Sequence, residues 1–183
     1  MEVKIWIHPV KHVKLIEGHE KNSHCIHAST DGSKNDSGVG SRIAIFSDNN
    51  LRATLKYRLN GRCSNNQAKQ MAIIKALEYM QYSKADEKTV LVYTDSRITL
   101  QMLQNHKKYK HIIEQIRTKV IEMEEQEWLL EFSWIKAHAG HNGNELSDQL
   151  AKEAVSSKTI EECYTRIPKS AVWSDLNEQS VKQ

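Results

Sequence analysis

The stretch CSNNQAKQMAIIKALEYM, residues 63 to 80, predicts the helix around which the rest of the chain is organised. At about 100° per residue, one side of this helix carries five small or apolar side chains: Ala72, Ile73, Ala76, Leu77 and Met80. We therefore expect a helix from about Asn65 to Tyr82, with Ser64 or Asn65 as its N-cap. Lys69 lies in the same apolar stripe and in the first turn, where the helix dipole favours negative charge. A lysine at this position needs an explanation.

Strand patterns lie on both sides of the helix. Three precede it, HCIHAST (24–30), VGSRIAIFS (39–47) and LRATLKYRL (51–59), and turn residues separate them. After the helix, TVLVYT (89–94) has the unbroken apolar run of a buried strand, and WLLEFSWI (128–135) is a further strand. The chain therefore begins as a three-stranded meander, and two more strands follow the helix.

Three more segments have helical spacing, at residues 97–104, 112–126 and 144–157. The element order βββαβααβα is typical of an α/β protein in which a mixed sheet carries helices. We expect one domain at 24–157. An N-terminal tail or linker at 1–23, which can add a short strand, precedes it, and a polar C-terminal tail at 158–183 follows.

Composition narrows the function classes. The 183 residues are 39% hydrophobic and 27% charged, which suits one core, and the net charge of +3 points only weakly to nucleic acid. The cysteines Cys25, Cys63 and Cys163 form no C-x-x-C pair, which fits a reducing compartment and argues against a zinc site. No apolar run reaches the roughly 18 residues of a membrane span, and no signal peptide is visible. We expect an intracellular protein, cytoplasmic or nuclear, without a membrane partner.

Three aspartates are candidates for one site. Asp31 follows the first strand, Asp95 follows the strand at 89–94, and Asp148 lies in the first turn of the last helix. Each also has a structural interpretation, as a turn residue, a cap or a favourable charge at a helix start. Because strand ends and a helix start can converge at one edge of an α/β layer, the three carboxylates could together bind Mg²⁺. His138, in a Gly-containing loop, could move protons there, although a lone loop histidine is more often only solvated.

Four motifs occur in the order of a known family. TDGS (30–33), CSNNQA (63–68) with MAIIKALE after it, YTDS (93–96) and WIKAHAGHNGNELSDQLAKEA (134–154) resemble the motifs of type 1 ribonuclease H. They are most similar to the ribonuclease H domain that follows reverse transcriptase in non-LTR retrotransposon polyproteins. The resemblance covers roughly residues 24 to 157. It implies a mixed five-stranded sheet and cleavage of the RNA strand of an RNA–DNA hybrid with two Mg²⁺ ions.

The resemblance also assigns roles to residues. It implies Asp31, Asp95 and Asp148 as catalytic metal ligands, and His138 as the catalytic residue of proton transfer and product release. It implies hybrid contacts from the start of the first helix, at Ser64, Asn65 and Asn66.

The family's second metal ligand, a glutamate, falls on Lys69. The resemblance thus accounts for the place of this residue on the buried face, because the family directs a ligand from there toward the sheet. A protonated lysine accepts no hydrogen bond and cannot bind a metal. At 4 Å and an effective dielectric constant near 20, two unit charges interact with about 4 kcal/mol, so reversing one charge should weaken Mg²⁺ binding strongly.

Two further features bear on the resemblance. Arg42 replaces a small residue, commonly glycine, and we expect its bulk to be tolerated at a strand edge. The basic segment at 105–111 predicts phosphate contacts by Lys107, Lys108 and Lys110, although a solvated turn between helices fits equally well.

Three functional hypotheses remain. The first is a retrotransposon-derived ribonuclease H domain, once fused to an upstream reverse transcriptase and monomeric, whose cleavage is impaired by Lys69. The second is a catalytically inactive module that binds RNA–DNA hybrid or structured RNA through shape and backbone contacts. The third is an integrase-like or exonuclease relative with the same sheet, against which the HAGHNGNELSD segment (138–148) argues.

Overall fold

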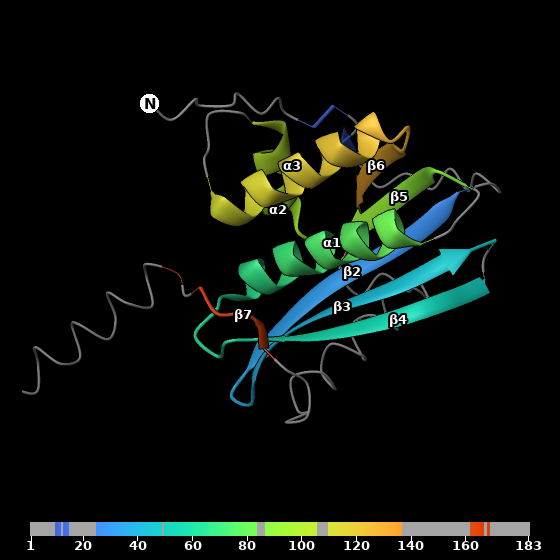
Figure 1. Cartoon of the computed structure of the whole chain (residues 1–183). Helices are drawn as coiled ribbons and strands as arrows, with labels where there is room; N and C mark the ends of the chain where they lie inside the picture. The colour runs from blue at the N-terminus through green and yellow to red at the C-terminus, as the bar shows by residue number, and fades with distance from the viewer. Residues whose placement is uncertain are drawn as a thin grey trace, which may run out of the picture.

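A seven-stranded mixed sheet with helices packed on one face forms the described part of the chain (Figure 1). The computed structural model describes residues 10–11, 13–14, 25–48, 50–83, 87–105, 110–136, 162–166 and 168. The strands follow the order β1-β6-β5-β2-β3-β4-β7 across the sheet. Their bounds are β1 Val13–Lys14, β2 Ile26–Asn35, β3 Gly38–Ser47, β4 Asn50–Leu59, β5 Thr89–Thr94, β6 Leu129–Trp134 and β7 Glu162–Tyr164.

The central strands combine a meander with parallel pairs. β3 pairs antiparallel with both β2 and β4, which makes the predicted meander. β5 lies parallel to β2 on one side and to β6 on the other. The short strands β1 and β7 extend the two edges, each parallel to its neighbour.

Three helices occupy the described residues: α1 Asn65–Tyr82, α2 Arg97–Gln104 and α3 His111–Glu125. The mixed α/β sheet is confirmed, and the first eight predicted elements occur in the predicted order. The last predicted helix, at 144–157, lies outside the described residues. No helix among the described residues is both long and apolar enough to cross a bilayer.

The sheet is wider than the five strands predicted from the sequence. The five are present as β2 to β6, β1 is a short strand of the kind that the N-terminal stretch was expected to add, and β7 lies in the stretch expected to be a polar tail. Strands of two and three residues are too short to show alternation, so local pattern gives no signal for them. The expectation that Arg42 lies at a strand edge is wrong, because β3 runs between β2 and β4 and Arg42 is fully buried there.

Helix α1 begins at the predicted cap and packs directly on the sheet. The Ser64 hydroxyl accepts a hydrogen bond from the backbone N–H of Gln67, and the Gln67 side chain accepts one from the Ser64 N–H, which completes a capping box. Gly32 of β2 lies so close to α1 that a Cβ atom there would be 2.4 Å from the Lys69 backbone nitrogen. The missing side chain therefore lets the helix backbone approach β2 at residue 69.

A buried arginine connects the other two helices. Arg117 of α3 is 1% exposed and donates hydrogen bonds to the carbonyl groups of Met102 and Asn105 at the end of α2, the second at 2.8 Å. Its guanidinium also pairs with Glu114 one turn earlier in α3. The last carbonyl groups of a helix have no following turn to donate to them, and Arg117 adds donors at this end of α2.

Candidate active site

Two adjacent parallel strands bring Asp31 and Asp95 side by side. β2 and β5 pair in a register that sets Thr30 opposite Thr94, so the residues that follow, Asp31 and Asp95, lie at the same level of the sheet. The expectation that Asp31 follows the first strand as a turn residue is wrong, because β2 continues through it to Asn35, whereas Asp95 lies just beyond β5 as expected. The sheet register, and not the local turn, therefore decides the place of both carboxylates.

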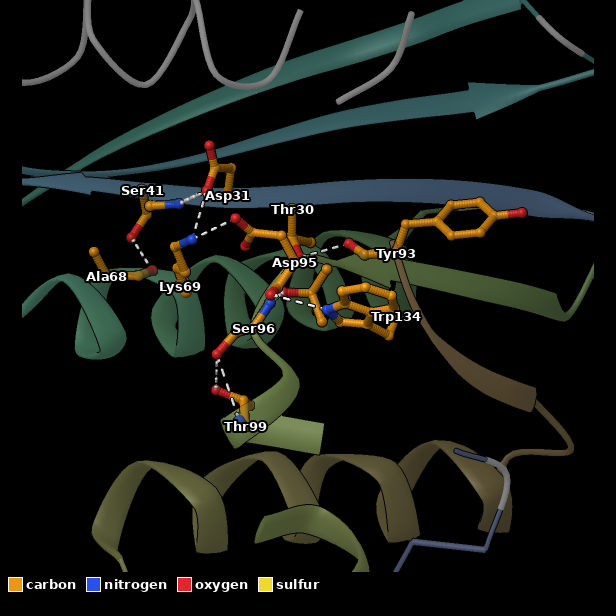
Figure 2. Close-up of polar contacts among 12 residues, drawn as sticks. Thr30, Asp31, Ser41, Ala68, Lys69, Tyr93, Asp95, Ser96, Thr99 and Trp134 are labelled. Atoms are coloured by element: carbon orange, nitrogen blue, oxygen red, sulfur yellow. Dashed lines mark hydrogen bonds and ion pairs between the residues drawn. The ribbon is translucent and has the colours of Figure 1, made fainter. Parts of the chain in front are cut away.

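Lys69 of α1 points at both carboxylates (Figure 2). Its Nζ atom lies 2.5 Å from Asp95 Oδ2 and 3.6 Å from Asp31 Oδ1. The Lys69 side chain is 15% exposed and each aspartate side chain is 10% exposed, so water screens these interactions little. The structure thus brings together Asp31, Lys69 and Asp95, which we call the Lys69 cluster.

The backbone around each aspartate is fixed by its own contacts. Asp31 Oδ1 accepts a hydrogen bond from the Gly32 N–H at 2.7 Å. The indole N–H of Trp134, at the end of β6, donates to the Asp95 backbone carbonyl at 3.2 Å. Ser96 caps α2 directly after Asp95, since its hydroxyl accepts from the backbone N–H of Thr99. Contacts from β2, from the end of β6 and from the start of α2 therefore fix the chain at the two aspartates.

One oxygen of the cluster has no partner in the described part of the chain. Asp95 Oδ1 is buried there without a hydrogen bond, while Oδ2 of the same carboxylate pairs with Lys69. A buried acceptor without a donor is costly. This oxygen marks a place where a further donor or a cation would be stabilised.

The Lys69 cluster does not fit the two Mg²⁺ ions that the resemblance implies. Asp31 and Asp95 offer the carboxylate oxygens that Mg²⁺ prefers, and Asp95 Oδ1, which has no partner among the described residues, would suit a cation. The ammonium group of Lys69, however, already pairs with both carboxylates and would repel a second cation. In the described ranges no three His, Cys, Asp or Glu side chains form a group able to hold a metal.

Several predicted site residues lie outside the described residues: His138, Asp148, Lys107 and Lys108. Their roles stay predictions. Lys110 is described, is exposed and precedes α3 as its N-cap residue, without a side-chain capping bond. At the start of α1, Asn65 and Asn66 are exposed, and Ser64 is half-buried because its hydroxyl caps the helix.

Sequence reasoning missed two residues near these sites. Gln67 closes the capping box of α1, and the S-x-x-Q spacing of residues 64–67 is a signal that could have identified it. Trp134 holds the Asp95 backbone, and its ring also lies under the guanidinium of Arg97, 5.8 Å from its centroid. No local pattern predicts this contact, because it joins strand ends that are 39 residues apart.

The chain matches known proteins in sequence and in fold. The family model for RNase H matches residues 12–156. Ribonuclease H of Vibrio vulnificus is 28% identical over 117 residues, which cover 58% of this chain and 71% of that protein. Ribonuclease H of Proteus mirabilis is 50% identical over 44 residues, so the chain spans only 25% of the length of that relative.

Solved structures agree in fold. The N-terminal RNase H domain of rv2228c from Mycobacterium tuberculosis superposes with a TM-score of 0.57 at 18% identity, over 72% of this chain and 98% of that one. LC11-RNase H1, from a compost metagenome, superposes in its complex with an RNA/DNA hybrid with a TM-score of 0.54 at 23% identity, over 72% of this chain and 99% of that one.

Proposed function

The chain belongs to the ribonuclease H family, and on this premise we propose that it binds RNA–DNA hybrids while Lys69 impairs their two-metal cleavage. The observation that carries the proposal is the pairing of the Lys69 ammonium with Asp95 at 2.5 Å and with Asp31 at 3.6 Å. In two-metal hydrolysis, carboxylates hold the ions that activate water and stabilise the leaving oxygen. A lysine among these carboxylates opposes that chemistry without changing the fold.

The net charge of the Lys69 cluster supports a low affinity for Mg²⁺. Two carboxylates and one ammonium sum to a single negative charge, whereas a glutamate at position 69 would bring the same three side chains to three negative charges. Mg²⁺ sites in proteins depend on such negative oxygens, and a lysine supplies neither charge nor an acceptor. We therefore expect a lower Mg²⁺ affinity, by about tenfold for each 1.4 kcal/mol of lost attraction.

Hybrid binding is supported by the start of α1. The N-terminus of a helix presents unpaired N–H groups and a partial positive charge to an anion such as phosphate. No acidic residue lies in the first turn of α1. Asn65 and Asn66 are exposed there, and asparagine can both donate and accept hydrogen bonds. This surface does not include Lys69, so binding and cleavage can be lost separately.

We also propose that the domain derives from a non-LTR retrotransposon, which rests on the resemblance of its motifs alone. Sequencing upstream of the coding region for a reverse transcriptase reading frame tests this origin. An unrelated host gene in a single continuous frame would contradict it.

Residual cleavage is the second candidate function, because Asp31 and Asp95 are both in place and one oxygen of Asp95 has no partner in the part of the chain that the structure describes. It predicts slow Mg²⁺-dependent hydrolysis by the native protein. The two candidates share one substrate class, and they differ only in whether the bound RNA strand is cut.

The proposed binding is tested by titrating fluorescent RNA–DNA hybrid, duplex DNA and single-stranded DNA at several salt concentrations. We expect a preference for hybrid and an affinity that falls as salt rises. The double variant Asn65→Ala, Asn66→Ala should weaken hybrid binding, since it removes polar groups at the start of α1. Asn50→Ala, an exposed asparagine at the other end of β4, is the matched control and should bind as native. Equal affinity for all three nucleic acids would refute the proposal.

A further inference from the structure

A segment beyond the family match is part of the sheet. The RNase H match ends at residue 156, yet β7 pairs in parallel with β4 through Glu162 opposite Arg58 and Tyr164 opposite Leu59. In Figure 1 this strand lies beside the end of β4, where the chain turns into α1. Residues 162–166 therefore border the loop that leads to the predicted hybrid contacts.

This loop, residues 60–64, is bonded directly to the segment at 162–166. The Asn60 backbone N–H donates to the Tyr164 carbonyl at 2.9 Å. The Cys63 thiol lies 4.0 Å from the Tyr164 carbonyl and 3.8 Å from the Arg166 carbonyl, and Cys63 is fully buried. Residues about 100 positions apart along the chain are thus held together by main-chain groups.

A lysine from the sheet holds the loop from another element. Lys34 Nζ, near the end of β2, donates to the Cys63 carbonyl at 2.8 Å. Within the loop, the Cys63 N–H donates to the Asn60 carbonyl at 2.9 Å, and Asn60 Oδ1 accepts from the Arg62 N–H at 3.0 Å. The loop is a tight turn with contacts to both β2 and residues 162–166.

Gln67 forms hydrogen bonds both with the N-cap residue of α1 and with the segment at 162–166. Its Oε1 atom accepts from the Ser64 N–H at 2.8 Å, and its Nε2 atom donates to the Arg166 carbonyl at 3.0 Å. Asn65 and Asn66 lie between the two capping residues, and both are exposed. One side chain therefore couples the start of α1 to the C-terminal segment.

We propose that residues 162–166, acting through Gln67, hold the start of α1 in the orientation that binds RNA–DNA hybrid. The proposal rests on the proposed function and extends it to a segment outside the family match. Gln67 is a positioning residue in this arrangement, since it acts through Ser64, Asn65 and Asn66. Losing one hydrogen bond of this kind corresponds to an affinity change of about three- to tenfold.

The test separates the two hydrogen bonds of Gln67 in the full chain. Gln67→Glu keeps an acceptor for the Ser64 N–H, and its charge suits the first turn, but a carboxylate cannot donate to the Arg166 carbonyl. Gln67→Met is uncharged and removes both bonds. If the helix cap alone matters, glutamate restores hybrid binding and methionine does not. If the link to residues 162–166 matters, both variants lose hybrid binding.

The labelling of Cys63 relative to Cys25 provides a second readout, because a general loss of stability would speed the labelling of both buried thiols. Burial raises the pKa of the Cys63 thiol, against the opposing effect of Lys34, so the native thiol should react slowly with a thiol reagent. Release of residues 162–166 should speed the labelling of Cys63 relative to Cys25, measured by mass spectrometry of the labelled peptides.

We expect both variants to lose about three- to tenfold in hybrid affinity, to lose less for single-stranded DNA, and to label faster at Cys63. Native hybrid affinity in Gln67→Glu would overturn the proposal, whether or not Cys63 is exposed. An equal loss for hybrid and single-stranded DNA in Gln67→Glu would reduce the effect to charge and also overturn it. Failure of the native protein to prefer hybrid would instead refute the proposed function, and the labelling rates would still report on the link.

Discussion

Replacing Lys69 by glutamate should turn a self-paired cluster into one that needs a cation. At an effective dielectric constant near 20, the 2.5 Å and 3.6 Å separations correspond to gross attractions of about 7 and about 5 kcal/mol. Desolvation offsets most of this, and breaking a buried pair typically costs about 3–5 kcal/mol. For a chain of this size each kcal/mol shifts the melting temperature by about 2–4 °C, so Lys69→Glu should melt on the order of 10 °C below native in EDTA.

Added Mg²⁺ should reverse much of that loss. A ligand at about 100 times its Kd stabilises the native state by about 2.7 kcal/mol, which corresponds to roughly 5–10 °C. The native protein should change little, because the Lys69 ammonium already pairs with both carboxylates. Differential scanning fluorimetry across an Mg²⁺ titration measures both curves.

Lys75→Glu is the matched control for this experiment. It makes the same charge reversal in α1, where Lys75 pairs with Glu78 at 2.7 Å and lies over the Tyr57 ring. Its melting temperature should not depend on Mg²⁺. The reasoning is refuted if native protein shows the same Mg²⁺-dependent rise as Lys69→Glu, or if Lys69→Glu is as stable as native in EDTA.

Three further predictions test the surroundings of the site. Gly32→Ala should destabilise by about 1–3 kcal/mol in urea unfolding, because the new Cβ would meet the α1 backbone; an unchanged midpoint would contradict the close packing. Arg117→Ala should lower the free energy of unfolding by about 3–5 kcal/mol, measured in the same way, and a change under about 1 kcal/mol would contradict its role at the end of α2. Burial raises the pKa of Tyr93 to about 12 from 10.0, so its neutral form contributes fully below pH 10 and that contribution is lost between pH 10 and 12. Tyr93→Phe should therefore lose less stability than native over that interval, and parallel pH profiles of unfolding would contradict this.

The elements predicted well are those whose evidence is local. The bounds of α1 agree with the sequence because a long apolar stripe and a capping serine both mark them. The convergence of Asp31 and Asp95 was predicted from strand ends that meet at one edge, and the motifs added Lys69 to them, since periodicity alone only marked Lys69 as misplaced. Family position supplied what local pattern could not.

The elements that were missed depend on contacts distant in sequence. Arg42 was wrongly placed at a strand edge, because the sequence of one strand does not show which strands lie beside it in the sheet. β7 has three residues and is stabilised by pairing with β4, so its sequence carries no alternation. The bond from Gln67 to the Arg166 carbonyl spans 99 residues and follows from the sheet edge that β7 extends.

Cleavage of an end-labelled RNA–DNA hybrid tests most directly whether Lys69 stands in the place of a catalytic cation. Native protein, Lys69→Glu and the double variant Lys69→Glu, Asp95→Asn are compared with Mg²⁺ and with Mn²⁺ at equal folded concentration. We expect Lys69→Glu to cut the RNA strand at least about tenfold faster than native, a gain of 1.4 kcal/mol or more, and the double variant to lose this gain. A native rate equal to that of Lys69→Glu, or a folded Lys69→Glu variant that stays inert, would contradict the account.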